Sequence, residues 1–127
     1  MIKGVIKVQG APEAIGTYSQ GIRSGNFIYT SGQIPLDPLT GNLKTGDIKG
    51  ETRQVLDNLD AVLRGGGSSL KSAVKLTVFI TDFDFFPKLN AVFKEYFPEK
   101  PPARSTIQVA ALPLDVRIEI EAVGAIE

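Results

Sequence analysis

The 127-residue sequence contains no cysteine and no histidine. Without thiols or imidazoles the chain can form neither disulfide bonds nor zinc sites built from Cys or His, and it cannot use a Ser-His or Cys-His pair for nucleophilic catalysis. Its Asp and Glu residues do not cluster with the spacing of a calcium-binding loop. The sequence therefore predicts no metal site. Any proton transfer near neutral pH must use Glu, Asp, Lys, Tyr, a bound substrate or water.

The sequence also lacks an excess of charge of either sign, and it lacks long hydrophobic runs. Its 14 Lys and Arg residues balance its 14 Asp and Glu residues, which argues against the basic surface of a nucleic-acid-binding protein. No apolar run approaches the length that spans a membrane, and the start of the chain lacks the apolar core of a signal peptide. We therefore expect one cytoplasmic domain over residues 1–127, with no membrane partner.

The first part of the chain is rich in short extended segments. Residues 2–8 alternate apolar side chains with Lys and Gly, which predicts an edge strand. Residues 18–23 and 27–32 are joined by a turn at 24–26 that contains Gly and Asn, which predicts a β-hairpin. Residues 36–50 are rich in Pro, Gly, Asp and Thr without an apolar period, so we expect a long surface loop there.

Two segments have the apolar spacing of helices. Residues 51–64 form the first, and the glycines at 65–67 end it. A glycine run can also hold phosphate, but this one follows a helix and lacks a downstream Gly-Lys-Ser/Thr, which favours a C-terminal cap. Asp84 is the expected N-cap of the second helix, and Asn90 lies beside its apolar stripe, where the pattern alone predicts a solvated residue. The stripe consists of Phe86, Leu89, Phe93, Tyr96 and Phe97.

Residues 72–80 are apolar and β-branched almost without a break, which predicts a central strand covered on both faces. The whole order of three strands, helix, strand, helix and two strands fits an α+β fold, in which a mixed β-sheet has two helices packed on one face. The other face then stays uncovered, so we expect a homo-oligomer that buries it. The apolar residues assigned to that face are Ile6, Val8, Phe27, Tyr29 and Phe79.

Charged residues lie on two alternating segments in the last third of the chain. Pro101 and Pro102 fix the backbone just before Arg104 and bias it away from helix. A later segment places Glu119 and Glu121 on one face of a strand. An arginine fork matches the two oxygens of a small carboxylate, and a neighbouring glutamate can hold or deprotonate a water. The alternative is a solvated face on which Arg104 and the glutamates form structural ion pairs.

Five short motifs lie in order along nearly the whole chain, at residues 16–21 (GTYSQG), 30–35 (TSGQIP), 54–59 (QVLDNL), 102–105 (PARS) and 118–122 (IEIEA). Together they resemble the RidA/YjgF/UK114 family of reactive-intermediate deaminases, also described as the endoribonuclease L-PSP family. The resemblance implies a chorismate-mutase-like α+β fold, assembled as a homotrimer with three ligand clefts between subunits. It also implies that the strand at 74–80 lies between the last two strands, which would otherwise read as a hairpin.

The resemblance further implies an enzyme that hydrolyses 2-imino or enamino acids, such as 2-iminobutanoate and 2-iminopropanoate, to 2-oxo acids and ammonia. The carbon of a protonated imine is already electrophilic, so this reaction needs no covalent nucleophile, metal or cofactor. The site has only to hold the small imino acid and to deliver water, which is largely a matter of positioning.

The same resemblance assigns roles to individual residues. Arg104 would clamp the substrate carboxylate, and Glu119 would orient the attacking water and act as base. Thr106 stands where many members have Cys, so its hydroxyl or main chain would contact the imine or carbonyl group. Glu121 is given only a structural role. The substrate-binding residues implied in addition to Arg104 are Tyr18 from a neighbouring subunit, Ser31, Gly32, Asn90 and Thr106.

Two other functions remain open from the sequence. A trimer that binds 2-oxo acids without turnover would use the same Arg104 clamp, but would not need Glu119 for affinity. Ribonuclease activity or inhibition of translation, reported for some family members, is a third possibility. Zero net charge, the absence of His and the absence of a basic run argue against nucleic acid as the main partner.

Overall fold

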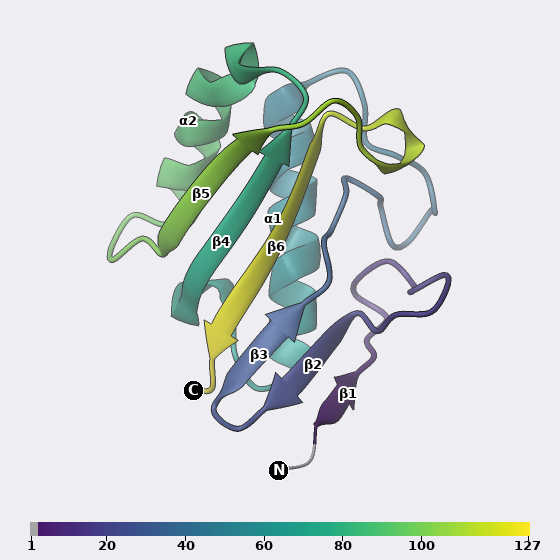
Figure 1. Cartoon of the computed structure of the whole chain (residues 1–127), viewed down its shortest axis with the longest axis vertical. Coiled ribbons are helices and arrows are strands. Elements are labelled where there is room, and N and C mark those ends of the chain that lie inside the picture. The colour runs from purple at the N-terminus through teal and green to yellow at the C-terminus, as the bar shows by residue number, and fades with distance from the viewer. Residues whose placement is uncertain (1–2) are drawn as a thin grey trace.

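The computed structural model describes residues 3–127, which form one mixed β-sheet and two α-helices (Figure 1). In chain order these are β1 (Gly4–Ile6), β2 (Gly21–Ser24), β3 (Phe27–Thr30), α1 (Ile48–Gly65), β4 (Ala73–Ile80), α2 (Phe86–Tyr96), β5 (Ala103–Gln108) and β6 (Ile118–Ala125). The sheet order is β1-β2-β3-β6-β4-β5, in which β4 and β5 run parallel and the other described pairs are antiparallel. The predicted order of elements is confirmed, and β4 lies between β5 and β6 as the resemblance implied.

Helix α1 begins at Ile48 rather than at the predicted Glu51. The side chain of Asp47 accepts a hydrogen bond from the N–H of Lys49 at 3.1 Å, which caps the helix and ends the surface loop. At the other end the N–H of Gly66 donates to the carbonyl of Leu63 at 3.0 Å, so the glycine run is a C-terminal cap as predicted. The apolar stripe of α1 is fully buried and consists of Val55, Leu56, Leu59, Val62 and Leu63.

The prediction that Asp84 caps the second helix is wrong. The side chain of Asp82 accepts a hydrogen bond from the N–H of Asp84 at 2.8 Å and starts a 3₁₀ turn over Phe83–Phe85. Helix α2 continues directly from this turn, so no side chain caps its first residue. An aspartate accepts the N–H two or three residues ahead, and the extra turn moves the capping position two residues toward the N-terminus.

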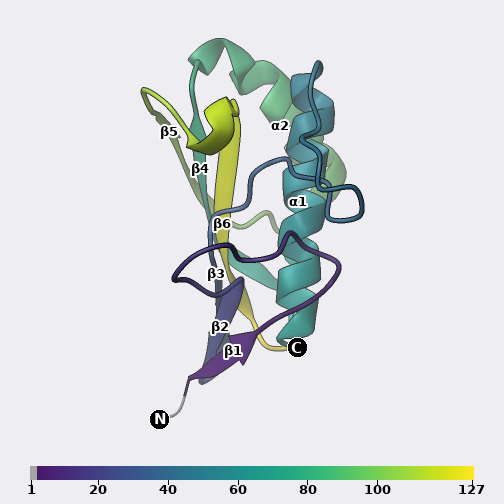
Figure 2. The same cartoon turned by 90° about the vertical axis from the view of Figure 1, so that its right-hand side faces the viewer.

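Both helices cover the same face of the sheet, as Figure 2 shows in edge view. Alternate residues of the two central strands, β4 and β6, point toward the helices and are fully buried, which places the hydrophobic core in this layer. The other face of β4 is partly open, since Lys75, Thr77 and Phe79 are only half-buried, so the expectation of a strand covered on both faces does not hold within one chain. The buried residues of these strands include Leu76, Val78, Ile80, Ile118 and Ile120.

The uncovered face is real, but two of its predicted residues are wrong. Phe27 and Tyr29 are 41% and 47% exposed, as expected. Ile6 is buried instead and packs at the end of α1, where a Cβ on Gly66 would stand 2.6 Å from Ile6 Cδ1. Val8 packs against the same core. The strand predicted over 2–8 is only Gly4–Ile6 in the described part of the chain, and Ile2 lies outside the described residues.

Along residues 3–127, neither helix combines the length and the apolar character that crossing a membrane requires.

Candidate functional site

Arg104 lies on β5, at the edge of the sheet, and points to the side that the helices cover. Its backbone partner on β4 is Leu76, which is fully buried under the helices. The Arg104 guanidinium donates from Nη1 to Oδ1 of Asn90 on α2 at 2.8 Å. Its Cζ atom lies 5.3 Å from the ring centroid of Phe86 and 4.9 Å from that of Phe93. Helix α2 therefore supplies all the side-chain partners found for Arg104 among residues 3–127.

None of the ion pairs found in residues 3–127 involves Arg104. The sequence-based alternative, in which Arg104 pairs with the strand glutamates, is therefore not what the structure contains. Burial lowers the pKa of the Arg104 guanidinium, although an arginine stays protonated at physiological pH. The site thus holds a half-buried positive charge whose partners are neutral.

A cavity of about 540 Å³ opens beside this guanidinium. Thr106 follows two residues later on the same face of β5, and its hydroxyl oxygen is buried with no hydrogen-bond partner among the described residues. A buried polar atom without a partner costs free energy unless a ligand or water satisfies it. The cavity is lined by Asn90, Phe93, Lys94, Phe97, Pro101, Pro102 and Arg104.

Glu119 lies on β6 and points to the uncovered face, because its neighbours Ile118 and Ile120 are fully buried on the helix side. Its carboxylate lies against Gly32, where a Cβ would stand 2.1 Å from Oε2 of Glu119. Burial raises the pKa of Glu119, and the nearby charge of Glu121 raises it further. A carboxylate with a raised pKa is a better proton acceptor than an ordinary one.

Ser31 and Tyr18 belong to the same side of the sheet. The hydroxyl of Ser31 donates to the carbonyl of Ser19 at 2.5 Å, and its N–H donates to the carbonyl of Gln20 at 2.9 Å. Ser31 therefore ties the segment before β2 to the end of β3. The Tyr18 ring is 54% exposed and lines a surface hollow of about 540 Å³ together with Ser31 and Tyr29.

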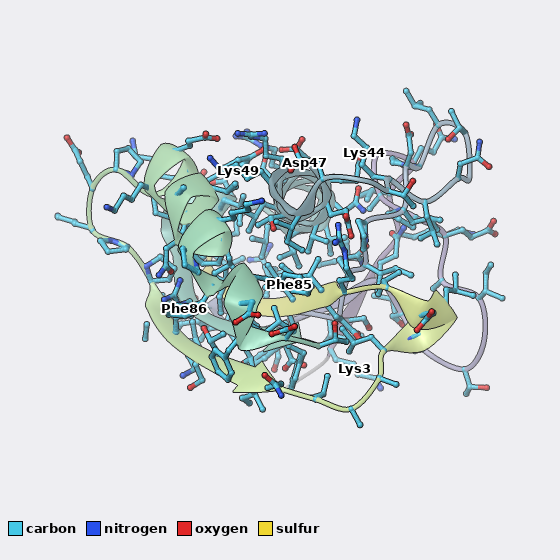
Figure 3. All side chains as sticks on the ribbon, turned by 90° about the horizontal axis from the view of Figure 1, so that it is seen from above. Lys3, Lys44, Asp47, Lys49, Phe85 and Phe86 are labelled. Atoms are coloured by element: carbon cyan, nitrogen blue, oxygen red, sulfur yellow. The ribbon has the colours of Figure 1, made fainter. Side chains whose placement is uncertain are left out.

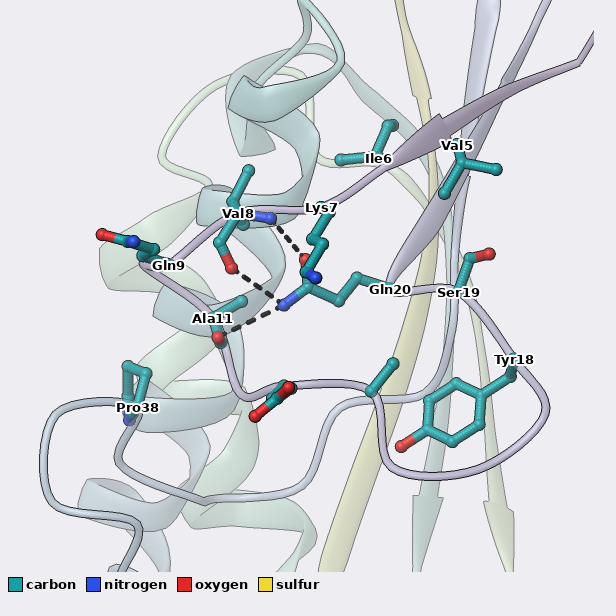
Figure 4. A pocket seen from close by; sticks show the side chains of 12 residues that line it. Val5, Ile6, Lys7, Val8, Gln9, Ala11, Tyr18, Ser19, Gln20 and Pro38 are labelled. Atoms are coloured by element: carbon teal, nitrogen blue, oxygen red, sulfur yellow. Dashed lines mark hydrogen bonds between the residues drawn. The ribbon is translucent and has the colours of Figure 1, made fainter.

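Another hollow, of about 560 Å³, lies between the N-terminal segment and the loop that bears Tyr18 (Figure 4). Gln20 is buried in its wall, where the side-chain amide donates to the carbonyls of Val8, Ala11 and Pro12 and accepts from the N–H of Val8. These hydrogen bonds join the Gln20 side chain to the backbone of the N-terminal segment. The polar group of this wall is thus structural, and we assign it no ligand.

The predicted site residues fall into two groups on opposite faces of the sheet. Arg104 is paired with Leu76 and Glu119 with Phe79, and residues three apart on one strand point to opposite faces. A single chain therefore does not bring the arginine and the glutamate to one ligand. The helix-side group is Arg104, Asn90 and Thr106, and the group on or beside the open face is Tyr18, Ser31, Gly32 and Glu119.

In residues 3–127 no group of three His, Cys, Asp or Glu side chains is placed to hold a metal ion.

Sequence reasoning missed the contribution of Phe86 and Phe93, which it assigned only to a core stripe. The residue pattern alone treated Asn90 as solvated, and only the family resemblance assigned it to the ligand cleft. The spacing 86, 90, 93 puts all three on one face of α2, which is a signal that could have grouped them. Figure 3 looks at the molecule from above, with the helices on one side of the sheet and Phe86 labelled where α2 begins. What the spacing could not reveal is that this face packs over Arg104.

Comparisons with known proteins extend over nearly the whole chain. The profile of the family described as Endoribonuclease L-PSP matches residues 8–126. A RutC family protein of Pyrococcus horikoshii is 51% identical over 97% of this chain and 98% of its own. A 2-iminobutanoate/2-iminopropanoate deaminase of Dermatophagoides farinae is 42% identical, with 98% of each chain covered. The crystal structure of Escherichia coli TdcF with bound serine matches at 42% identity with a TM-score of 0.93, covering 98% of this chain and 99% of that one.

Proposed function

Because this chain belongs to the Endoribonuclease L-PSP family, whose profile matches residues 8–126, we propose that it hydrolyses 2-imino and enamino acids to 2-oxo acids and ammonia. The observation that supports this most is the Arg104 guanidinium, half-buried beside a cavity and not paired with any carboxylate of the described residues. A cation held in this way favours a small anionic ligand. The name of the 42% identical relative from Dermatophagoides farinae suggests 2-iminobutanoate and 2-iminopropanoate as substrates.

In this proposal the substrate carboxylate accepts two hydrogen bonds from the Arg104 fork. The hydroxyl of Thr106, buried and without a partner in the described chain, lies on the same face two residues away and would bond to the imine nitrogen or to the carboxylate. This gives a role to a hydroxyl at the position where many family members have a thiol. Both contacts orient the imine carbon without forming a covalent bond to the protein.

Glu119 would hold the attacking water. Water adds to the carbon of the protonated imine, and the proton that the water loses passes to Glu119. Glu119 then returns this proton to the nitrogen and takes the proton of the new hydroxyl group as the C–N bond breaks, so the carbonyl forms and ammonia leaves. The ammonia accepts the proton from Glu119 and departs as ammonium, which restores the carboxylate. The raised pKa of Glu119 suits this exchange, because an acceptor that titrates closer to neutral pH both takes and returns a proton readily.

We propose that the complete site forms between two copies of the chain, in a homotrimer. One protomer would supply Arg104, and its partner would supply the open-face group that contains Glu119, because the two residues lie on opposite faces of one sheet. The exposed aromatic side chains of that face, Phe27 and Tyr29, are the apolar surface that such an assembly would bury.

A second candidate is a binding protein without turnover, favoured by the serine that the E. coli TdcF crystal structure contains. The endoribonuclease of the family description is a weaker candidate for this chain, because its net charge is zero and it has no histidine. The binding protein and the deaminase share Arg104. They differ in Glu119, whose replacement by Gln would abolish turnover in an enzyme and leave ligand affinity unchanged in a binding protein.

The test is a coupled assay in which a threonine or serine dehydratase releases the imine and semicarbazide traps it. We expect the wild-type protein to lower the amount of imine that semicarbazide traps and to speed release of the 2-oxo acid. Arg104→Ala should abolish this effect, and Arg53→Ala should not, because Arg53 pairs with Glu95 on the outer side of the helices. Full activity in a folded Arg104→Ala protein would refute the proposal.

A further inference from the structure

Three side chains of α2 surround the guanidinium of Arg104, and all three are uncharged. Phe86 and Phe93 each present a ring to it, at 5.3 and 4.9 Å from Cζ, and Asn90 accepts one of its N–H groups at 2.8 Å. We call Phe86, Asn90 and Phe93 the guanidinium cage. Phe93 is only 8% exposed, so the cage is anchored in the hydrophobic core.

Three other arginines of the chain are held differently. Arg53 pairs with Glu95 at 2.9 Å, Arg64 pairs with Asp60 at 2.7 Å, and Arg117 pairs with Glu51. In each of these pairs a carboxylate both orients the guanidinium and neutralises it. Arg104 is oriented by ring faces and an amide oxygen, which attract a cation without supplying a negative charge.

From this contrast, and on the basis of the proposed deaminase function, we infer that the guanidinium cage positions Arg104 while leaving its charge unneutralised for the substrate carboxylate. Phe86, Asn90 and Phe93 are in this view positioning residues, which act through Arg104 and need not touch the substrate. Of the five N–H donors of an arginine, Asn90 engages one, which leaves the rest of the fork available to a carboxylate.

The cage also explains why an amide, and not a carboxylate, occupies position 90. Asp has the shape of Asn, so it could accept the same N–H from Arg104, but it would form an ion pair that competes with the substrate. Ala at the same place would remove the hydrogen bond and leave the charge free. The two substitutions thus separate charge competition from loss of orientation. If the role of Asn90 were purely structural, Asp and Ala would not differ in this way in their effect on ligand binding.

The inference is tested with Asn90→Asp, Asn90→Ala and Phe86→Leu in the full chain. Isothermal titration with 2-oxobutanoate, the product of 2-iminobutanoate hydrolysis, measures affinity, and the coupled imine assay measures KM and kcat separately. Asn90→Asp should raise Kd and KM roughly tenfold or more, because a charged partner occupies the fork. Asn90→Ala and Phe86→Leu should raise them only about threefold, with kcat little changed, because each removes one weak orienting contact.

Two control variants match these changes. Asn42→Asp adds the same charge in an exposed loop, and Phe83→Leu removes a 46% exposed ring that contacts Phe86 but not Arg104. Both should bind 2-oxobutanoate as the wild type does. The inference is overturned if Asn90→Asp binds as tightly as the wild type, or if Asn90→Ala weakens binding as much as Asn90→Asp does in proteins of unchanged Tm. Because affinity is measured without turnover, an inactive wild type would refute the deaminase and still leave the cage testable.

Discussion

The carboxylate of Glu119 occupies the space beside Gly32 that a side chain would otherwise fill. A Cβ at position 32 would stand 2.1 Å from Oε2 of Glu119 and 2.9 Å from its Cδ. The obstructing atoms are the end of a flexible side chain, so an added methyl group would displace the carboxylate and disturb the backbone little. Glycine at this position therefore determines where the proposed water-binding carboxylate lies.

Gly32→Ala is accordingly expected to keep the wild-type fold and Tm within a few degrees while lowering kcat at least about tenfold, because a misplaced catalytic group loses its positioning. Thermal denaturation and the coupled imine assay check the two parts. Gly50→Ala is the matched control, since a Cβ there meets only ordinary contacts with Lys44 and Asp47, and Ala favours the helix in which Gly50 lies. An unchanged kcat in Gly32→Ala would show that turnover does not depend on the position of the Glu119 carboxylate.

The acid limb of the pH profile should depend on Glu121. Burial is the main cause that raises the pKa of Glu119, and the like charge of Glu121 adds to it. Because the proposed base works deprotonated, activity should be lost as pH falls through this raised pKa. Glu121→Gln removes one of the two causes, so it should lower the pKa and move the acid limb of kcat to lower pH.

The pH dependence of kcat for both proteins measures this shift directly. Glu95→Gln serves as its control, because it removes a carboxylate from the exposed side of α2 and should leave the limb unchanged. A limb that stays in place in Glu121→Gln would assign the acid limb to another group.

Local periodicity was enough to predict most elements of this fold. The helical spacing of α1 and the alternation of β6 are properties of neighbouring residues, and both were read correctly. The inward-facing side chains of β1 were not predicted correctly, because a strand of three residues has too few positions to indicate which face is inward. Packing against the glycine end of α1 decides that Ile6 is buried and Val5 exposed.

The site was less accessible to sequence reasoning, since it depends on contacts between distant segments. That Asn90 bonds to Arg104 follows from how α2 packs over β5. That Arg104 and Glu119 point to opposite faces follows from the register of β4 with both of its neighbours. Neither fact is encoded by residues near one another in the chain, so the residue types could be named from the sequence but not their arrangement.

The ion pair between Arg117 and Glu51 should contribute to stability through the burial of Glu51, which is 4% exposed. Replacing Arg117 by Gln leaves this carboxylate without its cation. We expect the free energy of unfolding to fall by roughly 3 kcal/mol, which is at the low end for a buried pair because the Arg117 side chain is 38% exposed. Urea denaturation at a fixed protein concentration measures the loss.

The double variant Glu51→Gln with Arg117→Gln should recover most of that stability, because no unpaired charge remains buried. Arg53→Gln should have little effect, since its pair with Glu95 is exposed on both sides. Equal losses in the single and double variants would show that packing by Arg117 over Phe85, rather than charge, is what matters.

The opposite orientation of Arg104 and Glu119 makes a quantitative prediction for mixed oligomers. Arg104→Ala and Glu119→Gln should each be inactive when pure, because every site then lacks one of the two groups. In hetero-oligomers formed from equal amounts, a site is intact when the Glu119→Gln chain supplies the arginine and the Arg104→Ala chain supplies the glutamate. Random mixing in a cyclic trimer leaves about one quarter of all sites intact, but each trimer that contains both variants has one intact site of three, so the mixed trimers should show about one third of wild-type activity. Co-expression with two affinity tags isolates the mixed species, and no recovery of activity in them would mean that the two residues act within one chain.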